Sequence, residues 1–314
     1  MTIAIIGAGL AGLACARALT EAGREVRLFD KGRAVGGRLA TKRLEVGEAT
    51  IRLDHGAQYL SARDPAFAAL LAETGARHWP DAERFVPVPG MSALPRAMAE
   101  GLEIATSRHV AWLEATQGGW LLHHLPAEKV RPGRPLPAME PLVDGPFEAV
   151  AITAPAPQAA ELLAAVAPGL AEPLAEVVYA PCWAWLAVFG EKLDLPDTLR
   201  PETGPIGWAA RNNSKPGRDD MEAWVVQAGP EWSRAHLEDD AASVAAALRE
   251  ALGAPPPLAE ATHRWRYSLV EQPLNIPCLW DGARRLGLAG DFCLAGRAEA
   301  AFLSGRALAE AILY

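Results

Sequence analysis

Apolar and polar positions along this chain follow two different periods, and the changes between them divide it into expected strands and helices. Four consecutive apolar residues at 3–6 predict a short buried strand. Apolar residues at helical spacing follow and predict a helix through Leu13, Ala16, Leu19 and Ala22. A second strand is expected at 25–29. This order of strand, helix and strand is typical of a parallel α/β sheet.

The rest of the pattern predicts further elements of both kinds. Further strands are expected at 49–53, 103–106, 109–113, 120–123, 147–153 and 286–291, and helices at 65–74, 94–101, 159–166 and 298–313. From 177 to 265 the composition shifts toward tryptophan-bearing strands, expected at 182–189, 207–210 and 222–227, with a helix at about 239–252 and a later strand at 263–268. This part predicts a mostly antiparallel sheet with a helix. The proline-rich stretch 126–146 predicts a loop or an irregular crossover.

Three glycines at G-x-G-x-x-G spacing join the first expected strand to the first helix. Gly7 permits a tight turn, Gly9 lets the backbone approach a pyrophosphate, and Gly12 lets the helix pack against the strand. The helix N-terminus offers unpaired N–H groups to that pyrophosphate. Asp30, after the second strand, can accept hydrogen bonds from a ribose. We therefore expect a dinucleotide to contact Asp30 and the turn formed by Gly7, Ala8, Gly9, Leu10, Ala11 and Gly12.

A second glycine-rich run follows Asp30 and narrows the choice of dinucleotide. A nicotinamide Rossmann domain usually moves directly from the acid into its next helix, whereas here a glycine pair precedes Arg38. The pair can bring backbone, and Arg38 a guanidinium, to a second phosphate or to an isoalloxazine edge. For Arg33 or Lys42 alone, a basic solvated loop is the simpler interpretation. The run resembles the second dinucleotide motif of the amine-oxidase superfamily of FAD proteins, which implies cofactor contacts from Lys31, Arg33, Gly36, Gly37, Arg38 and Leu39.

Composition and charge exclude several classes of protein. The chain has 314 residues, half of them apolar, which allows one large domain or two moderate ones. A net charge of −8 argues against a nucleic-acid binder or a polybasic membrane protein. The four cysteines are scattered without a C-x-x-C pair, so neither a disulfide framework nor a metal site is indicated. Residues 3–19 are apolar, but the nucleotide-binding pattern explains them better than a signal peptide or membrane helix, so we expect a cytoplasmic protein.

Polar and aromatic residues of the middle segment are candidates for a substrate pocket. Residues 211–218 are turn-rich and carry three cations. They form either an exposed hairpin tip or a grip for an anion or amide at the substrate mouth. The strand expected at 263–268 points two cations and two aromatic residues to alternate faces. The pocket candidates are Tyr59, Trp183, Trp208, Asn213, Lys215, Arg218, Arg264, Trp265 and Arg266, although for any single tryptophan the core is the better interpretation.

Several short motifs together make the chain similar to bacterial renalase-type proteins. They are GGRLAT (36–41), DHGAQY (54–59), PGMSALP (89–95), NSKPGR (213–218), WSxxHL (232–237), RWRY (264–267) and the late Gly290-Asp291 with its following helix. The resemblance covers essentially the whole chain. It implies an α/β, two-domain, p-hydroxybenzoate-hydroxylase-like fold, with a Rossmann-type FAD domain and a substrate domain built on a mixed or antiparallel sheet. The expected FAD-binding domain is discontinuous and comprises 1–70, 92–176 and 266–314, and the substrate domain comprises 71–91 and 177–265.

The resemblance also implies cofactor contacts outside the two glycine runs. Those contacts are Gly56, Ala57, Gln58, Tyr59, Val110, Gly290, Asp291, Glu299 and Ala300. In such proteins Val110 would hold the adenine by its backbone and Asp291 would reach the ribityl chain. The helix that follows would aim its positive end at the pyrimidine side of the flavin. His55 is interpreted as a structural residue rather than a catalytic base. No cysteine matches the covalent attachment site of monoamine oxidases, so we expect non-covalent FAD.

The activity implied by the resemblance is that of an oxidase acting on misreduced nicotinamide dinucleotides. Hydride would pass from 2- or 6-dihydroNAD(P) isomers to the flavin, and O2 would take the electrons, giving NAD(P)+ and hydrogen peroxide. Such a substrate becomes aromatic when oxidised and needs positioning more than acid–base help. The alternative is an amine oxidase or desaturase acting on a small amine or apolar substrate. The excess of cations near the expected substrate mouth is an argument against this alternative. A non-catalytic flavoprotein ranks last. The expected partners are thus a small molecule and O2, with no nucleic acid and no membrane.

Overall fold

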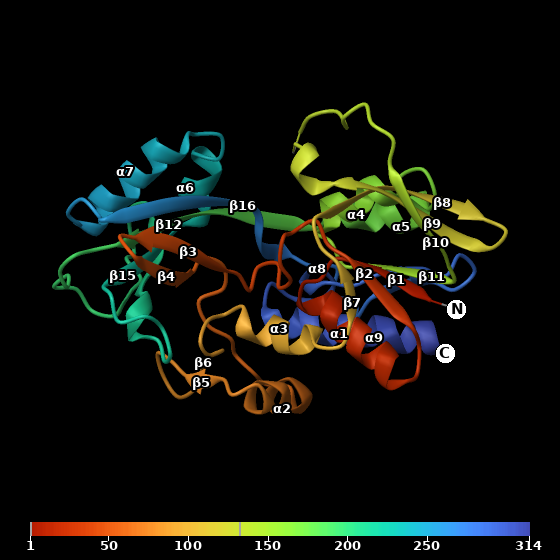
Figure 1. The fold of residues 1–314 in the computed structure, drawn as a ribbon, viewed down its shortest axis with the longest axis horizontal. Coiled ribbons are helices and arrows are strands. Elements are labelled where there is room, and N and C mark those ends of the chain that lie inside the picture. The colour runs from red at the N-terminus through yellow and green to blue at the C-terminus, as the bar shows by residue number, and fades with distance from the viewer. Residues whose placement is uncertain (1, 132) are drawn as a thin grey trace. The chain divides into compact units, whose positions relative to one another are not determined.

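The chain forms two compact units in a computed structural model that describes residues 2–131 and 133–314 (Figure 1). The first unit contains the residues up to Gly37, together with Pro95–Val178 and Val270–Tyr314. The second contains Arg38–Leu94 and Tyr179–Leu269. Residues 38–70 were expected in the first unit but pack within the second. The assignment of cofactor and substrate to these units stays a prediction.

A six-stranded sheet is the centre of the first unit. Its order is β17 (Leu279–Asp281), β18 (Leu286–Leu288), β11 (Ala149–Ile152), β1 (Ile3–Ile6), β2 (Val26–Phe29) and β7 (Glu103–Ala105). All neighbours pair in parallel except β17 with β18. Both β1 and β11 are buried along their whole length, as expected for parallel strands covered on two faces. The predicted strands of this sheet are therefore confirmed.

Two helices of the first unit pack closely against each other, as Figure 1 shows. They are α1 (Leu10–Glu21) and α9 (Ala298–Leu313), which come from opposite ends of the chain. A Cβ on Gly305 of α9 would lie 2.1 Å from the carbonyl oxygen of Ala11 in α1, so only glycine permits this approach. The first unit also contains α4 (Ala156–Leu163), α5 (Pro168–Ala171), η2 (Glu172–Glu176) and α8 (Asp291–Leu294).

A three-stranded antiparallel sheet packs near β2 through the ring of Phe29, which contacts Phe147 and His124. It contains β8 (Arg108–Thr116), β9 (Gly119–Pro126) and β10 (Leu142–Phe147) in the order β10-β9-β8. The predicted strands at 109–113 and 120–123 are confirmed, and they pair as a hairpin. The expectation of a loop over 126–146 is wrong at its C-terminal end, where β10 forms a third strand. The backbone groups of β10 pair with those of β9, which makes this segment a strand. The short helix η1 (Ala127–Lys129) follows β9. Residue 132 lies outside the described residues.

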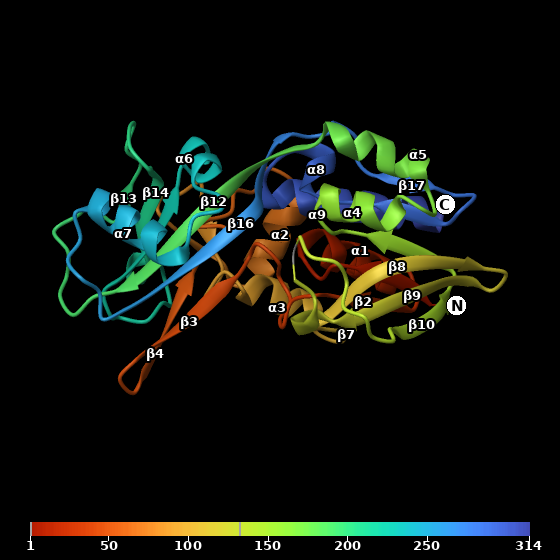
Figure 2. The same ribbon diagram turned by 90° about the horizontal axis from the view of Figure 1, so that it is seen from above.

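The second unit is built on a five-stranded sheet that confirms the predicted antiparallel arrangement. Its order is β13 (Thr198–Leu199), β14 (Ile206–Arg211), β15 (Ala223–Ala228), β12 (Val178–Val188) and β16 (Ala259–Gln272). Figure 2 shows the long strands β12 and β16 next to each other. One apolar cluster joins this sheet to α7 (Ala241–Leu252) and includes Trp183, Trp185 and Trp224, which are therefore core residues.

A second apolar cluster joins the same sheet to the hairpin of β3 (Thr41–Val46) and β4 (Ala49–Asp54). This packing is the reason why residues 38–70 belong to the second unit. The unit also contains α2 (Pro65–Glu73), β5 (Arg77–His78), β6 (Phe85–Val86), η3 (Asn212–Ser214) and α6 (Pro230–Ala235), while α3 (Ala93–Ala99) lies at the junction of the two units in sequence. Asp64 is the N-cap of α2, because its carboxylate accepts the N–H groups of Ala66 and Phe67.

Candidate functional site

The first glycine turn connects β1 to α1 and leaves one side open. Gly7 has φ +108°, and a Cβ there would lie 2.6 Å from Thr153 Oγ1. A Cβ on Gly12 would lie 1.9 Å from the carbonyl oxygen of Gly7. These two glycines are therefore required by the packing of the protein itself. Gly9 differs from them, because a Cβ there would meet no atom of the described residues within 4 Å.

Asp30 fastens this turn to the segment that follows β2. Its carboxylate accepts the N–H of Ala8 at 2.6 Å and the N–H of Gly32, also at 2.6 Å. Burial raises the pKa of Asp30, and the two N–H groups oppose that rise. The expected contact to a ribose stays a prediction. The structure shows in addition that this acid orders the glycine turn.

The second glycine run lies against the first. The N–H of Gly36 donates to the carbonyl oxygen of Ala8 at 2.8 Å, and a Cβ on Gly37 would lie 3.6 Å from the Cα of Gly9. Gly36 and Gly37 both have positive φ, at 114° and 54°. The open side of Gly9 is therefore a cradle bounded by backbone, at the N-terminus of α1. Its shape and its N–H groups fit the diphosphate of a dinucleotide.

The other predicted contacts of this run differ in their exposure. Lys31 donates to Gln158 Oε1 at 2.9 Å, Arg33 is exposed and Leu39 is buried. Arg38 belongs to the second unit, where its guanidinium donates to the carbonyl oxygen of Ser268 at 3.0 Å. The interpretation of Arg33 as part of a solvated loop agrees with its exposure.

The late Gly-Asp pair lies at the same edge of the sheet as the glycine turn. β18, β1 and β2 run in parallel, so Gly290, Gly7 and Asp30 all follow carboxyl ends, where ligands of such sheets bind. The N–H of Gly290 donates to Ser304 Oγ at 3.0 Å. Asp291 is buried at the start of α8, whereas Glu299 and Ala300 are buried in the first turn of α9. The structure therefore brings the N-terminal and C-terminal cofactor motifs to one edge.

Val110, the expected adenine contact, lies on β8 at a break in strand register. It pairs with His124 of β9, and the next pair joins Trp112 to His123, so β8 contains one extra residue there. Val110 is itself buried. Its contact with an adenine stays a prediction.

A buried ion cluster occupies the second unit where a substrate grip was expected. Asp54 Oδ2 accepts Arg218 Nη2 at 2.6 Å and Lys215 Nζ at 3.4 Å. Its other oxygen accepts the hydroxyl of Thr41 and the N–H of Met91. The side chains of Asp54, Lys215 and Arg218 are at most 1% exposed. Two cations therefore share one carboxylate, and the cluster has an excess of positive charge.

This cluster corrects the interpretation of residues 211–218 as an exposed hairpin tip. Arg211 forms an ion pair with Glu222, and Asn212 donates to the carbonyl oxygen of Arg52 at 2.8 Å. Asn213 accepts the N–H of Ala223 at 3.1 Å. The three cations of the segment are internal because burying them requires carboxylates, which other parts of the unit supply. Contacts from Asn213, Lys215 or Arg218 to a substrate stay predictions, and the two cations already have a partner in Asp54.

Lys215 should make stability depend on pH in the alkaline range. Burial lowers its pKa to about 8, although Asp54 opposes the change. Between that pH and the ordinary lysine value near 10.4, the unfolded chain holds one more proton than the folded chain. The free energy of unfolding is then expected to rise with pH by up to about 1.4 kcal/mol per unit. Urea unfolding from pH 7.5 to 9.5 should show this slope, and Lys215→Met should remove it.

Lys192→Met provides the matched control, since Lys192 is exposed in the same unit. That variant should keep the parent's slope. Equal slopes for the parent and for Lys215→Met would show that the ammonium of Lys215 does not titrate in this range.

The segment expected beside the flavin is held by the same unit. A Cβ on Gly56 would lie 2.0 Å from the carbonyl oxygen of Arg38, so this glycine is required by the protein backbone. Gln58 accepts Lys215 Nζ at 3.0 Å and donates to the carbonyl oxygen of Asp54 at 2.6 Å. Gln227 donates to the carbonyl oxygen of Gly56 at 2.7 Å. The 54–59 motif is thus ordered by the ion cluster and by β15.

His55 has a structural environment, as the sequence indicated. It stacks on Trp265, whose indole N–H donates to the carbonyl oxygen of His55 at 2.9 Å. Burial lowers the pKa of His55 to about 4, and the neighbouring His263 adds to that effect. The imidazole is therefore neutral at pH 7.

The cations expected on the 263–268 strand are also paired within the protein. Arg264 and Arg266 both bind the carboxylate of Glu238, at 2.9 and 2.6 Å. Arg264 also lies over the ring of Trp183, whose indole N–H donates to the carbonyl oxygen of His236. Their roles as substrate contacts stay predictions. Glu238 was not predicted, because an acid in the turn between α6 and α7 gives no local signal of its partners on β16.

Two of the predicted aromatic walls do meet. The rings of Tyr59 and Trp208 lie 5.7 Å apart at an angle of 64°. Arg84 lies over the ring of Tyr59 and Arg200 lies near that of Trp208. Neither arginine was predicted, because each comes from a short polar segment without a motif.

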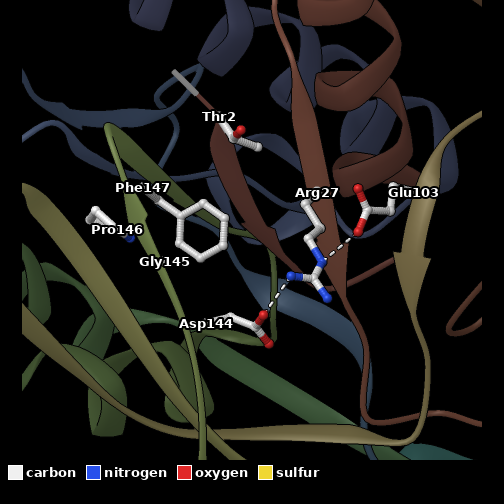
Figure 3. A pocket seen from close by; sticks show the side chains of 7 residues that line it. All are labelled: Thr2, Arg27, Glu103, Asp144, Gly145, Pro146 and Phe147. Carbon is white, nitrogen blue, oxygen red and sulfur yellow. Dashed lines mark hydrogen bonds and ion pairs between the residues drawn. The ribbon is translucent and has the colours of Figure 1, made fainter.

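A surface hollow in the first unit lies away from the expected cofactor contacts (Figure 3). It is lined by Thr2, Arg27, Glu103, Asp144, Gly145, Pro146 and Phe147. Arg27 forms ion pairs there with Glu103 and Asp144. Thr2 and Glu103 mark the amino ends of parallel strands, opposite the edge that carries Gly7 and Asp30. The hollow is therefore not the cofactor cradle.

In residues 2–131 and 133–314, no group of three or more His, Cys, Asp or Glu side chains is arranged to hold a metal ion. Within the same ranges, every helix is too short or too polar to cross a bilayer.

Sequence similarity to known proteins is found in the first part of the chain. Residues 5–74 match the family described as an NAD(P)-binding Rossmann-like domain. A protein of Mycobacterium tuberculosis (strain CDC 1551 / Oshkosh), provisionally named the flavin-containing monoamine oxidase AofH, is 40% identical over 73 residues. That alignment covers 23% of this chain and 15% of the relative. The chain thus spans a small part of the length of this curated relative.

Comparison of structures covers the whole chain. A protein from Exiguobacterium sp. 255-15, provisionally named a protoporphyrinogen oxidase, has a TM-score of 0.75 at 13% identity, over 99% of this chain and 98% of that one. Putrescine oxidase bound to putrescine has a TM-score of 0.69 at 15% identity, over 100% and 99% of the two chains. Cyclohexylamine oxidase from Brevibacterium oxydans IH-35A has a TM-score of 0.70 at 13% identity, over 99% and 98%. The predicted mixed α/β fold with a Rossmann-like domain is confirmed.

Proposed function

We propose that this chain is an FAD-dependent oxidase. The observation that carries the proposal is the open cradle at Gly9, bounded by the second glycine run at the N-terminus of α1. Bound FAD would supply the acceptor for a hydride equivalent and the route by which its electrons reach O2. The name of the sequence relative, a flavin-containing monoamine oxidase, and the oxidase names of the structural neighbours support the same assignment.

Residues of the first unit would hold the cofactor. The backbone N–H groups that follow Gly9 would bind the diphosphate, and Asp30 would accept a ribose hydroxyl. Asp291 would contact the ribityl chain, as the family resemblance implies. The N-terminus of α9, which has no side-chain cap, would favour negative charge near it. We propose non-covalent binding, because no cysteine of the sequence matches the covalent attachment site of monoamine oxidases.

The proposed substrates are the 2- and 6-dihydro isomers of NAD(P). Such a substrate gives up a hydride, and together with one proton and O2 the products are NAD(P)+ and hydrogen peroxide. The reaction needs no strong base in the pocket. This agrees with the second unit, in which Asp54 is bound by two cations and the pKa of His55 is lowered to about 4.

Oxidation of a small amine is the second candidate. The names of putrescine oxidase and cyclohexylamine oxidase favour it. Cations expected near the substrate mouth were the sequence-based objection to an amine substrate. In the structure, however, Lys215 and Arg218 are paired with Asp54. Arg264 and Arg266 are paired with Glu238. Those four cations therefore do not distinguish between the two substrate classes.

An anaerobic titration distinguishes the candidates. We expect purified protein to show flavin absorbance that bleaches on addition of 2- or 6-dihydroNAD, and to regain it with peroxide formation when O2 is admitted. Putrescine and cyclohexylamine, added in parallel, should leave the spectrum unchanged. Bleaching by an amine alone would establish the second candidate. Folded protein that cannot be reconstituted with FAD would reject both.

A further inference from the structure

The pair formed by Tyr59 and Trp208 has an unusual electrostatic setting within the second unit. Tyr59 follows β4, and Trp208 lies on β14, so packing of distant segments creates the pair. Trp208 pairs in register with Gln227, which in turn donates to the carbonyl oxygen of Gly56. The side-chain amide of Gln227 therefore links the strand that carries Trp208 to the segment that carries Tyr59. A fixed aromatic pair can hold a flat ligand at little entropic cost.

Each ring of the pair has a guanidinium close to it. Arg84 lies 4.6 Å from the centroid of Tyr59, and two hydrogen bonds between Leu60 and Phe85 keep these segments together. Arg200 lies 5.8 Å from the centroid of Trp208. It follows β13, whose last pair joins Leu199 to Ala209, so the register continues to Trp208. Both arginines are thus placed by local strand pairing.

The positive charges of the two arginines differ in whether a carboxylate neutralises them. Arg84 pairs with Asp81 at 3.1 Å. Across residues 2–131 and 133–314, no carboxylate lies within ion-pair distance of Arg200, which is exposed. The aromatic pair therefore has a net positive environment. A protonated amine would be repelled there, and an anion would be attracted.

The indole of Trp208 provides a second, independent observation. Its Nε1 is buried, and among the described residues no acceptor lies within hydrogen-bond distance. Most buried indole N–H groups have an acceptor, and an unpaired one costs free energy. An acceptor atom supplied by a ligand would remove that cost.

We infer that Tyr59, Trp208, Arg84 and Arg200 form the subsite for the phosphate-bearing part of a nicotinamide dinucleotide substrate. The arginines would bind phosphate oxygens, the rings would pack against a base or ribose, and Trp208 Nε1 would donate to an acceptor of the ligand. This inference rests on the proposed function. The four paired cations do not distinguish between the two substrate classes, but this subsite does, because its positive charge would attract a phosphate and repel a protonated amine.

The test compares a substrate that has the diphosphate with one that lacks it. For the holoenzyme, Arg200→Ala should raise the KM for 6-dihydroNAD about tenfold, the size of effect expected for a lost charge-assisted contact to phosphate. The KM for 6-dihydronicotinamide riboside should not change. Arg84→Ala should act in the same direction, and Trp208→Phe, which keeps a ring but removes the N–H, should have a smaller effect. Arg43→Ala, on the exposed β3 strand, is the matched control.

Binding is measured separately from turnover. Isothermal titration calorimetry with NAD+ should show weaker binding by Arg200→Ala than by the parent or by Arg43→Ala, at equal flavin content. Equal affinities, equal losses with both substrates, or loss of flavin from Arg200→Ala would each overturn the subsite. If no dihydronicotinamide isomer reduces the flavin of the parent, the proposed function fails instead, and the NAD+ titration still decides whether the subsite exists.

Discussion

A Gly9→Ala variant is expected to fold as the parent does and to lose most of its affinity for FAD. Within the part of the chain that the structure describes, the new methyl group would meet no atom within 4 Å. The φ of residue 9 is −78°, which any residue adopts. It would occupy the space through which a diphosphate must approach the backbone. We expect FAD affinity to fall at least about tenfold, or ~1.4 kcal/mol, with little change in the free energy of unfolding of the apoprotein.

Gly12→Ala should behave differently, because its methyl group would lie 1.9 Å from the carbonyl oxygen of Gly7. That overlap should destabilise the apoprotein by about 3 kcal/mol or more. Gly169→Ala is the matched control, since its Cβ would also meet open space, away from the turn. Urea unfolding of the apoproteins and titration with FAD measure both effects. If Gly9→Ala bound FAD as tightly as Gly169→Ala, the diphosphate would not lie at this turn.

Asp54→Asn is expected to be the most destabilising single change in the second unit. It would leave Lys215 and Arg218 buried without a counter-charge, which should lower the free energy of unfolding by about 3–5 kcal/mol. Asp219→Asn is the control, because the ion pair of Asp219 with Arg52 is more exposed, and we expect a loss under about 1 kcal/mol there. Urea unfolding at pH 7 measures both values.

The same cluster predicts the response to acid. Burial raises the pKa of Asp54, but the charges of Lys215 and Arg218 outweigh it and hold the pKa below its ordinary value. The stabilisation by Asp54 is therefore present above the unfolded pKa of about 3.9 and is lost as the pH falls below it. Adding Lys215→Met to Asp54→Asn should recover part of the lost stability. A further loss of stability in the double variant would contradict the account of excess buried charge.

The local elements of the fold could be predicted because their signals lie in neighbouring residues. The strand at 3–6, the helix after it and the cap by Asp64 each depend on residues within one or two turns of chain. The third strand of the small sheet, β10, could not be recognised in the same way. Its proline-rich sequence has little strand character, and only its pairing with β9 makes it a strand.

The candidate site shows the same division. Gly7, Gly12 and Asp30 were assigned from their spacing, and the structure explains each by a contact close in the fold. The cations Lys215 and Arg218 were expected at a substrate mouth because the sequence shows charge without showing its partner. Asp54 lies 161 residues before Lys215, and only folding brings the two together.

By itself, the sequence determined the Rossmann-like start of the chain, the five parallel strands of the six-stranded sheet, and the glycine positions of the expected cofactor turn. These follow from backbone sterics and hydrophobic periodicity, which act over a few residues. Only the tertiary structure decided which charges are neutralised within the protein and which remain available. It paired Asp54 with two cations and Glu238 with two more. Among the residues that the structure describes, it left Arg200 beside Trp208 without a carboxylate at ion-pair distance. The physical reason is that the interaction of a charge depends on distance and burial in space, and neither can be read from separation along the chain.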